Sequence, residues 1–269
     1  MLKSFLLSVI CSNFAPCILQ GAIFLYMKYA IIAAGEGSRL ASEGIDSPKP
    51  LVKINGEPLI DRLIRVFMDN NATEIAVICN NLTQLVSDHL CAIQRDGLGG
   101  RHIPLRYVVK TTPSSMHSFY ELSSMLADEP FVLTTVDTIF RESEFKTYVE
   151  QFADCLQQQD GMMGVTDYID DEKPLYVGTD EQMNITGFFD DASGLDSQCS
   201  ATYISGGIYG LTPRAITTLN GCMARGESRM RNFQRALVRD GQRLKAFAFS
   251  KVLDIDHASD IGKAEAFLQ

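Results

Sequence analysis

The stretch that decides the fold is Tyr29-Ala30-Ile31-Ile32-Ala33-Ala34-Gly35-Glu36-Gly37-Ser38-Arg39-Leu40. Its apolar first half predicts a buried strand, which opens into a loop with two glycines and an arginine. Gly35 and Gly37 allow backbone angles closed to other residues, so consecutive N–H groups can face one anion. Further on, Lys49 stands between two prolines. The segment therefore favours phosphate binding, with Arg39 as a bidentate fork and Lys49 as a point charge.

Two commoner phosphate-binding motifs do not fit this loop. A dinucleotide-binding fingerprint needs a third glycine where Leu40 stands, and a P-loop needs Gly-Lys-Ser/Thr where 40–42 reads Leu-Ala-Ser. Two glycines after a strand are by themselves equally consistent with a plain tight turn. The arginine and the Pro-Lys-Pro segment favour the anion site instead.

The loop, together with Pro48-Lys49-Pro50-Leu51, resembles the opening signature of the sugar-1-phosphate nucleotidyltransferases, and the similarity extends through most of residues 27–269. The resemblance implies a GT-A-type nucleotidyltransferase fold and an enzyme that transfers a nucleoside monophosphate from an NTP to a sugar-1-phosphate, releasing pyrophosphate. By this resemblance, Arg39 would contact the outer phosphates of the NTP, and Lys49 would contact the phosphate that reacts. The nucleotide-binding residues that it implies in the loop are Ala33, Ala34, Gly35, Glu36, Gly37 and Ser38.

Composition limits the partners. A chain of 269 residues is long enough for one large α/β domain. The net charge of −9 argues against binding along a nucleic-acid backbone, which needs clustered positive charge. The seven cysteines are odd in number with no C-x-x-C pair, and the four histidines show no metal-binding spacing. We therefore expect small-molecule partners, reduced thiols and a cytoplasmic protein.

Residues 1–26 are unlike the rest of the chain. Lys3 followed by the apolar run 5–10 is similar to the start of a secretory signal peptide, but Asn13, Pro16 and Gln20 interrupt the segment before it could span a bilayer. Since Met27 directly precedes the first strand, we expect 1–26 to lie outside the fold and 27–269 to form a single nucleotidyltransferase domain without membrane contact. A start codon assigned too far upstream is favoured over a membrane-tethering extension, and secretion comes last.

Strands and helices alternate along the first half of the chain, which predicts an α/β fold with a mostly parallel, Rossmann-like central sheet flanked by helices. The predicted strands are 29–34, 74–79, 105–109 and 131–136, and the predicted helices are 59–68, 83–93 and 115–126. Ligands bind at the carboxyl ends of parallel strands, so the Gly35 loop, Asn80-Asn81, Thr111-Thr112 and Asp137 are expected on one rim.

The second half of the chain predicts a small antiparallel addition that forms the acceptor pocket. Its expected strands are 164–169, 174–178, 185–189, 203–211 and 244–255, and its expected helices are 213–219, 230–239 and 259–268.

Two aspartates are the candidate ligands of a Mg²⁺ ion. Asp137 ends a strand too apolar to hold a charge inside it, and Mg²⁺ on nucleotide phosphates needs only one or two protein carboxylates. Asp254 and Asp256 share a strand face, and the resemblance assigns the metal to Asp256. Helix or turn capping is the alternative for Asp137 and Asp256. His257-Ala258 replaces the Thr-Pro of the family's closing motif, which leaves the geometry of the helix cap open. The sequence also leaves open whether Asp254 or Asp256 binds the metal.

The remaining site residues are assigned by position. Thr112, Ser114 and Ser115 occupy the family's nucleobase and ribose position, although ordinary N-capping also suits them, and Asn80 is a weaker candidate for the same pocket. The acceptor phosphate is assigned to Gly206, Gly207, Arg229 and Arg231; a β-bulge and a solvated helix start are the alternatives. Glu172-Lys173-Pro174 is similar to a Glu-Lys-Pro motif of some relatives.

The reaction implied needs no general base, because a phosphate nucleophile is already anionic and positioning and charge neutralisation suffice. Three rivals remain open. A phosphocholine-type cytidylyltransferase would differ only in its acceptor pocket. A glycosyltransferase of the same fold would carry Asp-x-Asp where this chain has Val136-Asp137-Thr138. A nucleotide sensor would bind the NTP without releasing pyrophosphate. The sequence leaves the sugar, the base and the oligomeric state open.

Overall fold

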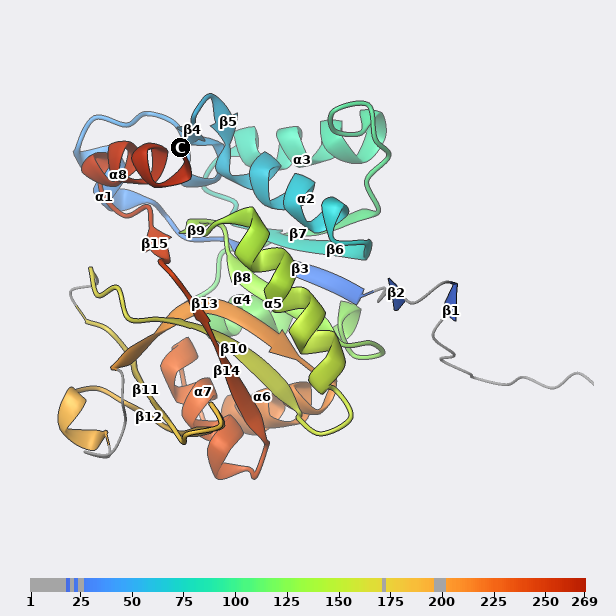
Figure 1. Ribbon diagram of the computed structural model, residues 1–269. Helices are drawn as coiled ribbons and strands as arrows, with labels where there is room; N and C mark the ends of the chain where they lie inside the picture. Colours follow the sequence, from blue (N-terminus) through green and yellow to red (C-terminus); the bar gives the residue numbers. More distant parts are fainter. Residues whose placement is uncertain (1–17, 20–21, 24–26, 171–172, 196–201) are drawn as a thin grey trace, which may run out of the picture.

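The computed structural model describes residues 18–19, 22–23, 27–170, 173–195 and 202–269 (Figure 1). Its centre is a sheet in which four parallel strands lie in the order β8-β3-β6-β7. These strands are β3 (Met27–Ala33), β6 (Ala72–Cys79), β7 (Leu105–Val109) and β8 (Phe131–Thr135). The predicted α/β architecture with a parallel centre is therefore confirmed.

The second half of the chain extends this sheet beyond β8. β13 (Tyr203–Leu211) runs antiparallel to β8, and β10 (Gly161–Thr166) runs antiparallel to β13. β14 (Leu244–Phe249) completes this edge parallel to β10. A hairpin of β11 (Tyr176–Thr179) and β12 (Ile185–Phe189) attaches to the start of β13. The predicted antiparallel addition is thus present, with β14 as its one parallel member.

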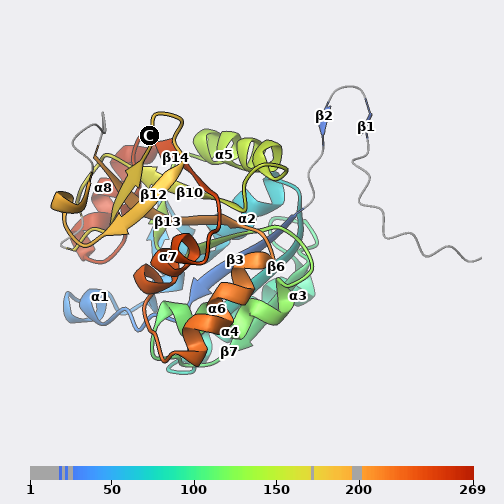
Figure 2. The same ribbon diagram turned by 90° about the horizontal axis from the view of Figure 1, so that it is seen from below.

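Helices cover both faces of the sheet (Figures 1 and 2). One face packs against α2 (Leu59–Asp69), α3 (Gln84–Asp96), α5 (Glu142–Cys155) and α8 (Ala258–Leu268). The other packs against α4 (Ser115–Leu122), α6 (Arg214–Ala224) and α7 (Met230–Arg239). β3 shows why its sequence is uniformly apolar: Tyr29 and Ile31 join the first core, whereas Ala30 and Ile32 join the second.

Several expected elements differ from the structure. The strand expected at 164–169 is found three residues earlier, as β10, and the helix expected at 213–219 extends to Ala224, as α6. The expected helix 115–126 ends at Leu122 and continues only as the short 3₁₀ helix η2 (Ser123–Met125). The expected strand over 244–255 is wrong, because β14 ends at Phe249. β15 (Leu253–Asp254) pairs instead with β9 (Thr138–Ile139), in a separate two-stranded sheet that runs antiparallel. This change of partner moves the end of the chain toward the rim of the central sheet.

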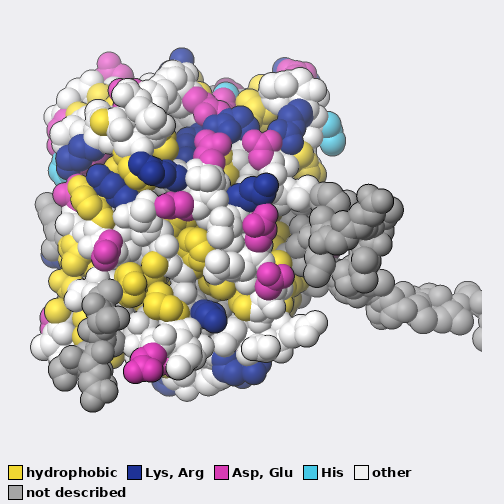
Figure 3. All heavy atoms as spheres, viewed as in Figure 1, with side chains coloured by type: hydrophobic (Ala, Val, Ile, Leu, Met, Phe, Trp, Pro, Cys, Tyr) yellow, Lys and Arg dark blue, Asp and Glu magenta, His cyan; other side chains and the backbone are white. Residues whose placement is uncertain are grey.

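The smaller elements complete the chain. They are the hairpins β1 (Ile18–Leu19) with β2 (Ala22–Ile23) and β4 (Lys53–Ile54) with β5 (Glu57–Pro58), and the 3₁₀ helix η3 (Ala192–Gly194). Most of the predicted extension 1–26 lies outside the described residues. Within the described part of the chain, every helix is too short or too polar to cross a bilayer. On the face shown in Figure 3, basic and acidic side chains lie interspersed.

Candidate functional site

A cavity of about 440 Å³ opens at the carboxyl ends of the parallel strands. The loop after β3, the loop after β7 and the end of β8 all contribute to its wall, as expected for the rim of a parallel sheet. The structure brings together here most of the residues assigned from the sequence to the nucleotide and the metal: Ala34, Gly35, Glu36, Gly37, Ser38, Arg39, Lys49, Thr112, Ser114, Ser115, Asp137 and Asp256. Ala33 and Asn80 line a separate cavity beneath the loop.

The Gly35 loop takes its shape from Gly37. Gly37 has φ +65°, and a Cβ atom there would lie 3.1 Å from Cβ of Lys49. Any larger residue would therefore be strained and would press on the lysine. The chain turns at Gly37 into α1 (Ser38–Ser42), which carries Arg39. Lys49 begins the 3₁₀ helix η1 (Lys49–Leu51), whose entry angle is fixed by the preceding proline.

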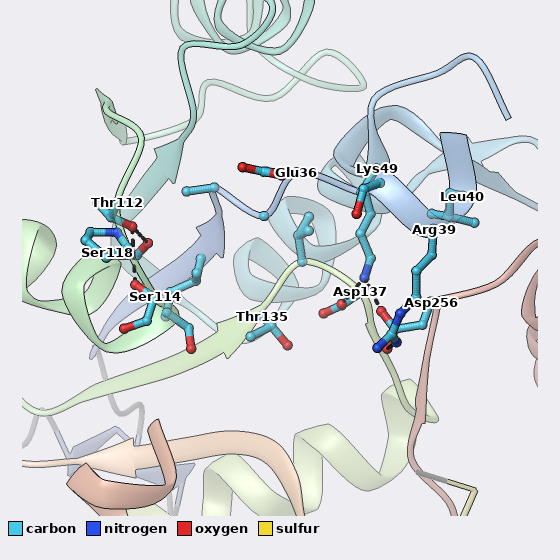
Figure 4. Close-up of a pocket in the computed structure, with 18 residues that line it drawn as sticks. Glu36, Arg39, Leu40, Lys49, Thr112, Ser114, Ser118, Thr135, Asp137 and Asp256 are labelled. Carbon is cyan, nitrogen blue, oxygen red and sulfur yellow. Dashed lines mark hydrogen bonds and ion pairs between the residues drawn. The ribbon is translucent and has the colours of Figure 1, made fainter. Parts of the chain in front are cut away.

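Four charged side chains meet at one end of the cavity (Figure 4). The Nζ of Lys49 forms an ion pair with Asp137 and lies 2.8 Å from Oδ1 of Asp256. Arg39 Nη1 lies 3.1 Å from the other oxygen of Asp256. Burial acts to lower the pKa of Lys49, but the two carboxylates outweigh it and hold this pKa above its usual value, so the ammonium stays charged.

The pairing of β15 with β9 explains how Asp256 reaches Asp137. Leu253 pairs with Ile139, and the N–H of Ile255 donates to the backbone carbonyl of Asp137 at 3.2 Å. Residue 256 is thereby placed beside residue 137. Asp137 caps no helix, because α5 begins after Arg141, and the N-cap of α8 is His257. Asp254 lines the wall of a neighbouring cavity and not this one.

The donor set fits a small divalent cation. The two carboxylates converge on one cation, the ammonium of Lys49, and Mg²⁺ bound to nucleotide phosphates takes only one or two protein carboxylates. Among the described residues no group of three or more His, Cys, Asp or Glu side chains could hold a metal. Phosphate and water oxygens would have to complete the octahedron around such an ion.

The opposite end of the cavity is lined by hydroxyl groups (Figure 4). Oγ1 of Thr112 lies 2.6 Å from Oγ of Ser118, and Thr112 also donates to the carbonyl of Ser114 at 3.2 Å. Ser118 was not assigned from the sequence, although it lies one helical turn after Ser114 and Ser115 on the same face of α4. That i, i+4 spacing is the signal that would have found it.

Asn80 supports the loop from beneath. Its side-chain amide donates to the carbonyl of Gly35 at 3.0 Å, and its Oδ1 accepts from the N–H of Leu82 at 3.1 Å. Both ends of this buried side chain are therefore used within the protein. In this structure Asn80 holds the nucleotide loop against the end of β6 and does not face the cavity assigned to the nucleobase.

A second cavity, of about 340 Å³, adjoins the first, and Arg39 and Asp256 line both. Gly206 lies in its wall, at a β-bulge: Gly164 pairs with Ile208 and Val165 with Ser205, which leaves Gly206 and Gly207 out of the pairing. Gly207 has φ +70°, which its lack of a side chain permits. The sequence left open whether this glycine pair forms a β-bulge, and in the structure it does.

Neither of the arginines assigned to the acceptor phosphate lines the second cavity. Arg231 is paired with Asp190 at 2.7 Å and donates to the carbonyl of Lys173 at 3.0 Å, so it supports the segment that carries Lys173. The backbone N–H of Arg229 donates to Oγ of Ser114 at 3.4 Å. Glu172 lies outside the described residues.

Sequence reasoning missed most of the second cavity's polar lining. Lys263 lies 3.0 Å from Asp170 and 3.1 Å from Asp260, and Tyr168 and Thr166 line the same wall. Lys263 and Asp260 are three residues apart on α8, a spacing that places them on one face of this helix, which begins two residues after Asp256. No comparable local pattern links Thr166 or Tyr168 to the site.

Comparisons with known proteins agree with this geometry. The family model described as Nucleotidyl transferase matches residues 28–269. The chain is 24% identical over 249 residues to the UTP–glucose-1-phosphate uridylyltransferase AglF of Haloferax volcanii, which covers 90% of this chain and 97% of that protein.

Two solved structures show the same fold. A putative glucose-1-phosphate thymidylyltransferase from Bacillus anthracis superposes with a TM-score of 0.73 at 20% identity, covering 90% of this chain and 94% of that one. The CTP:phosphocholine cytidylyltransferase LicC from Streptococcus pneumoniae superposes with a TM-score of 0.69 at 17% identity, covering 91% and 100%.

Proposed function

This chain belongs to the nucleotidyl transferase family, and we propose that it transfers a nucleoside monophosphate from an NTP to a sugar-1-phosphate, with release of pyrophosphate. The observation that carries the proposal is the junction of the two cavities at Arg39 and Asp256, beside Lys49 and Asp137. A nucleotide in the first cavity and an acceptor in the second would meet at this charged cluster.

In the proposed step, a phosphate oxygen of the acceptor attacks the α-phosphorus of the NTP. The new P–O bond forms as the bond from that phosphorus to the bridging oxygen of pyrophosphate breaks, so the electron pair leaves with pyrophosphate. No proton needs to move, because the nucleophile is already an anion. What the protein must supply is alignment and positive charge.

Lys49 and Arg39 supply that charge from fixed positions. Lys49 is only 10% exposed and charged, and its stem lies against Gly37 in the loop that would surround the phosphates. Arg39 is more exposed and faces the junction, which suits a guanidinium that meets phosphate oxygens as they arrive. Thr112, Ser114, Ser115 and Ser118 offer hydroxyls to the ribose and base at the far end.

Asp137 and Asp256 would hold a Mg²⁺ ion in this proposal. The ion, when bound, supplies Lewis-acid neutralisation of the phosphate oxygens. Binding of the ion and of the triphosphate would draw the Lys49 ammonium away from the two carboxylates and onto phosphate, since both cations compete for the same oxygens.

The second cavity favours a sugar over a quaternary ammonium acceptor. Its described lining is mostly polar, with Tyr168 as its one aromatic side chain. The ammonium of Lys251 lies 3.9 Å from the centre of that ring, so one face of the ring already binds a cation of the protein. Neighbouring acidic and basic side chains such as Asp170 and Lys263 can accept hydrogen bonds from sugar hydroxyls and donate to them. The sugar-phosphate activities named for two relatives point the same way.

A matrix of NTPs against phosphorylated acceptors, scored by pyrophosphate release, tests the proposal. We expect release with glucose-1-phosphate or a related sugar-1-phosphate and one or two NTPs. Release with phosphocholine alone would assign the protein to the cytidylyltransferase alternative. Tight NTP binding without release under any pairing would favour a nucleotide sensor. Localisation in the cytoplasm, where NTPs are supplied, completes the proposal.

A further inference from the structure

Two carboxylates accept four hydrogen bonds from the turn that carries Asp256 and hold it in place. Oδ2 of Asp260 accepts from the N–H of Asp256 at 3.1 Å and from that of His257 at 2.8 Å. Oε2 of Glu43 accepts from the N–H of Ala258 at 2.6 Å, and its Oε1 lies 2.6 Å from Nδ1 of His257. The N–H groups of Asp256 and His257, which precede α8, and of Ala258, its first residue, are thus satisfied by side chains on both sides of the turn.

These two carboxylates have different origins. Asp260 belongs to α8 itself, so its bonds shape the turn but do not connect it to another part of the protein. Glu43 follows α1, the short helix that carries Arg39, and lies 215 positions from Ala258. Arg39 and Glu43 are four residues apart and both reach the same turn. Among these contacts, Glu43 is the one that binds the backbone of the Asp256 turn to the nucleotide loop.

We propose that Glu43 is a positioning residue that sets the distance between Asp256 and the nucleotide loop. The inference rests on the proposed function, since it treats Asp256 as a cation ligand. Asp256 is 45% exposed and follows a strand of only two residues. The N–H of Ile255 binds the carbonyl of Asp137 and Asp260 shapes the turn, but of these backbone contacts only the bond from Ala258 to Glu43 reaches the segment that carries Arg39. Without Glu43, the turn would keep its backbone bond to Asp137 but lose its link to the segment after α1, so the Asp256 carboxylate would sample a wider range of positions beside Asp137 and bind a shared cation less well.

Glu43 acts through geometry more than through charge. It lines neither cavity, and its side chain is 38% exposed, so its ion pair with His257 is worth little by itself in water. What Glu43 contributes is two contacts of 2.6 Å, to the Ala258 N–H and to Nδ1 of His257, which fix the position of one turn. A glutamine at this position keeps an acceptor for the Ala258 N–H and an amide that can donate to His257, and should therefore preserve the geometry that alanine removes.

Titration with Mn²⁺ alone tests this inference without any substrate. Binding is measured by the decrease in the EPR signal of free Mn²⁺. Glu43→Ala should weaken Mn²⁺ binding by about 10-fold, the low end of the range for lost outer-shell support of a metal ligand. Glu43→Gln should recover most of the affinity. Glu265→Ala is the matched control, because Glu265 also ties α8 to a distant segment, through one bond of 3.0 Å to the N–H of Asn55, but at the other end of the helix. It should bind Mn²⁺ as wild type does.

Kinetics provide a second readout. In Glu43→Ala the Mg²⁺ concentration for half-maximal turnover should rise by the same factor, with kcat recovering at saturating Mg²⁺. A merely structural role would lower the melting temperature and leave this metal dependence unchanged. Glu43→Ala with wild-type Mn²⁺ affinity overturns the positioning role and leaves the proposed function intact. Wild-type protein that binds no Mn²⁺ removes the metal role of Asp256 and this inference with it. Failure of the acceptor matrix would not alter the Mn²⁺ result.

Discussion

The two adjoining cavities are built in different ways. The wall of the first comes mainly from two short stretches, 34–40 and 112–118, that directly follow parallel strands. The described wall of the second is gathered from 166–170, Lys173, 204–206 and 252–263, across a bulge, a short strand and a helix. The proposed triphosphate site is thus built from short stretches that each come soon after one strand, whereas the proposed acceptor wall depends on how distant segments pack. The predictions below test that division.

The largest effect is expected at the junction. Asp137→Asn and Asp256→Asn each keep the side chain's size but remove the charge that would bind the cation, so each should abolish Mg²⁺-dependent pyrophosphate release. Because residues that serve one metal act as a unit, the double variant should be little worse than either single one. Asp254→Asn is the control, since Asp254 lines only the second cavity. An inactive Asp254→Asn beside an active Asp256→Asn would exchange the two assignments.

Lys49→Ala should lower turnover by roughly 10² to 10³-fold, the range for losing one preorganised charge contact in the transition state. The same change should tighten Mn²⁺ binding in the absence of nucleotide, because it removes the ammonium that lies between the two carboxylates. Turnover assays and Mn²⁺ titration measure the two effects. Wild-type turnover would remove Lys49 from the catalytic step, and weaker Mn²⁺ binding would argue against a shared site for the two cations.

Separate substitutions should divide the two cavities. Ser118→Ala should raise KM for the NTP and Lys263→Ala should raise KM for the acceptor, each by roughly 2- to 10-fold, as expected for one hydrogen bond. Neither should change the other substrate's KM, because each residue lines only one cavity. Initial rates with one substrate varied at a time decide this. If Lys263→Ala raised the KM of the NTP as well, the two walls would not be functionally separate.

A pair outside both cavities should affect stability alone. The hydrogen bond that Asp61 accepts from Nε2 of His89 raises the pKa of His89 above its usual value, against the effect of burial. This contribution is complete below the ordinary pKa of histidine and is lost as the pH rises through the raised pKa. His89→Gln should therefore destabilise the protein more at pH 5.5 than at pH 9, by about 1 kcal/mol for this partly buried pair. Denaturant unfolding at the two pH values, with turnover as a control, measures it.

The smallest effect is expected at the N-terminus. A chain beginning at Met27 should fold and turn over as the full chain does, because the family match begins at residue 28 and β3 begins at Met27. Thermal melting and pyrophosphate release compare the two chains. An insoluble shortened chain would show that residues 1–26 contribute to the fold.

The sequence predicted the parallel sheet and its rim because both follow from local patterns. Apolar runs such as 131–135 read as strands covered on both faces, and residues directly after such strands meet at one edge. Gly37 and the prolines around Lys49 likewise fix their backbone through their own side chains, or the lack of one. Most of the residues that the sequence assigned to the nucleotide therefore line one cavity, with Ser118 missed and with Ala33 and Asn80 outside it, and their role in nucleotide binding stays a prediction.

Tertiary structure alone decided how the far end of the chain joins this rim. The sequence of 244–255 predicts one continuous strand, yet β15 leaves β14 and pairs with β9, which carries Asp256 to Lys49 across 207 positions. Glu43 and Lys263 acquire their partners in the same way. Local patterns specify backbone conformation and the burial of a face, but pairing between distant segments depends on which alternative buries the most surface and satisfies the most hydrogen bonds in the whole molecule.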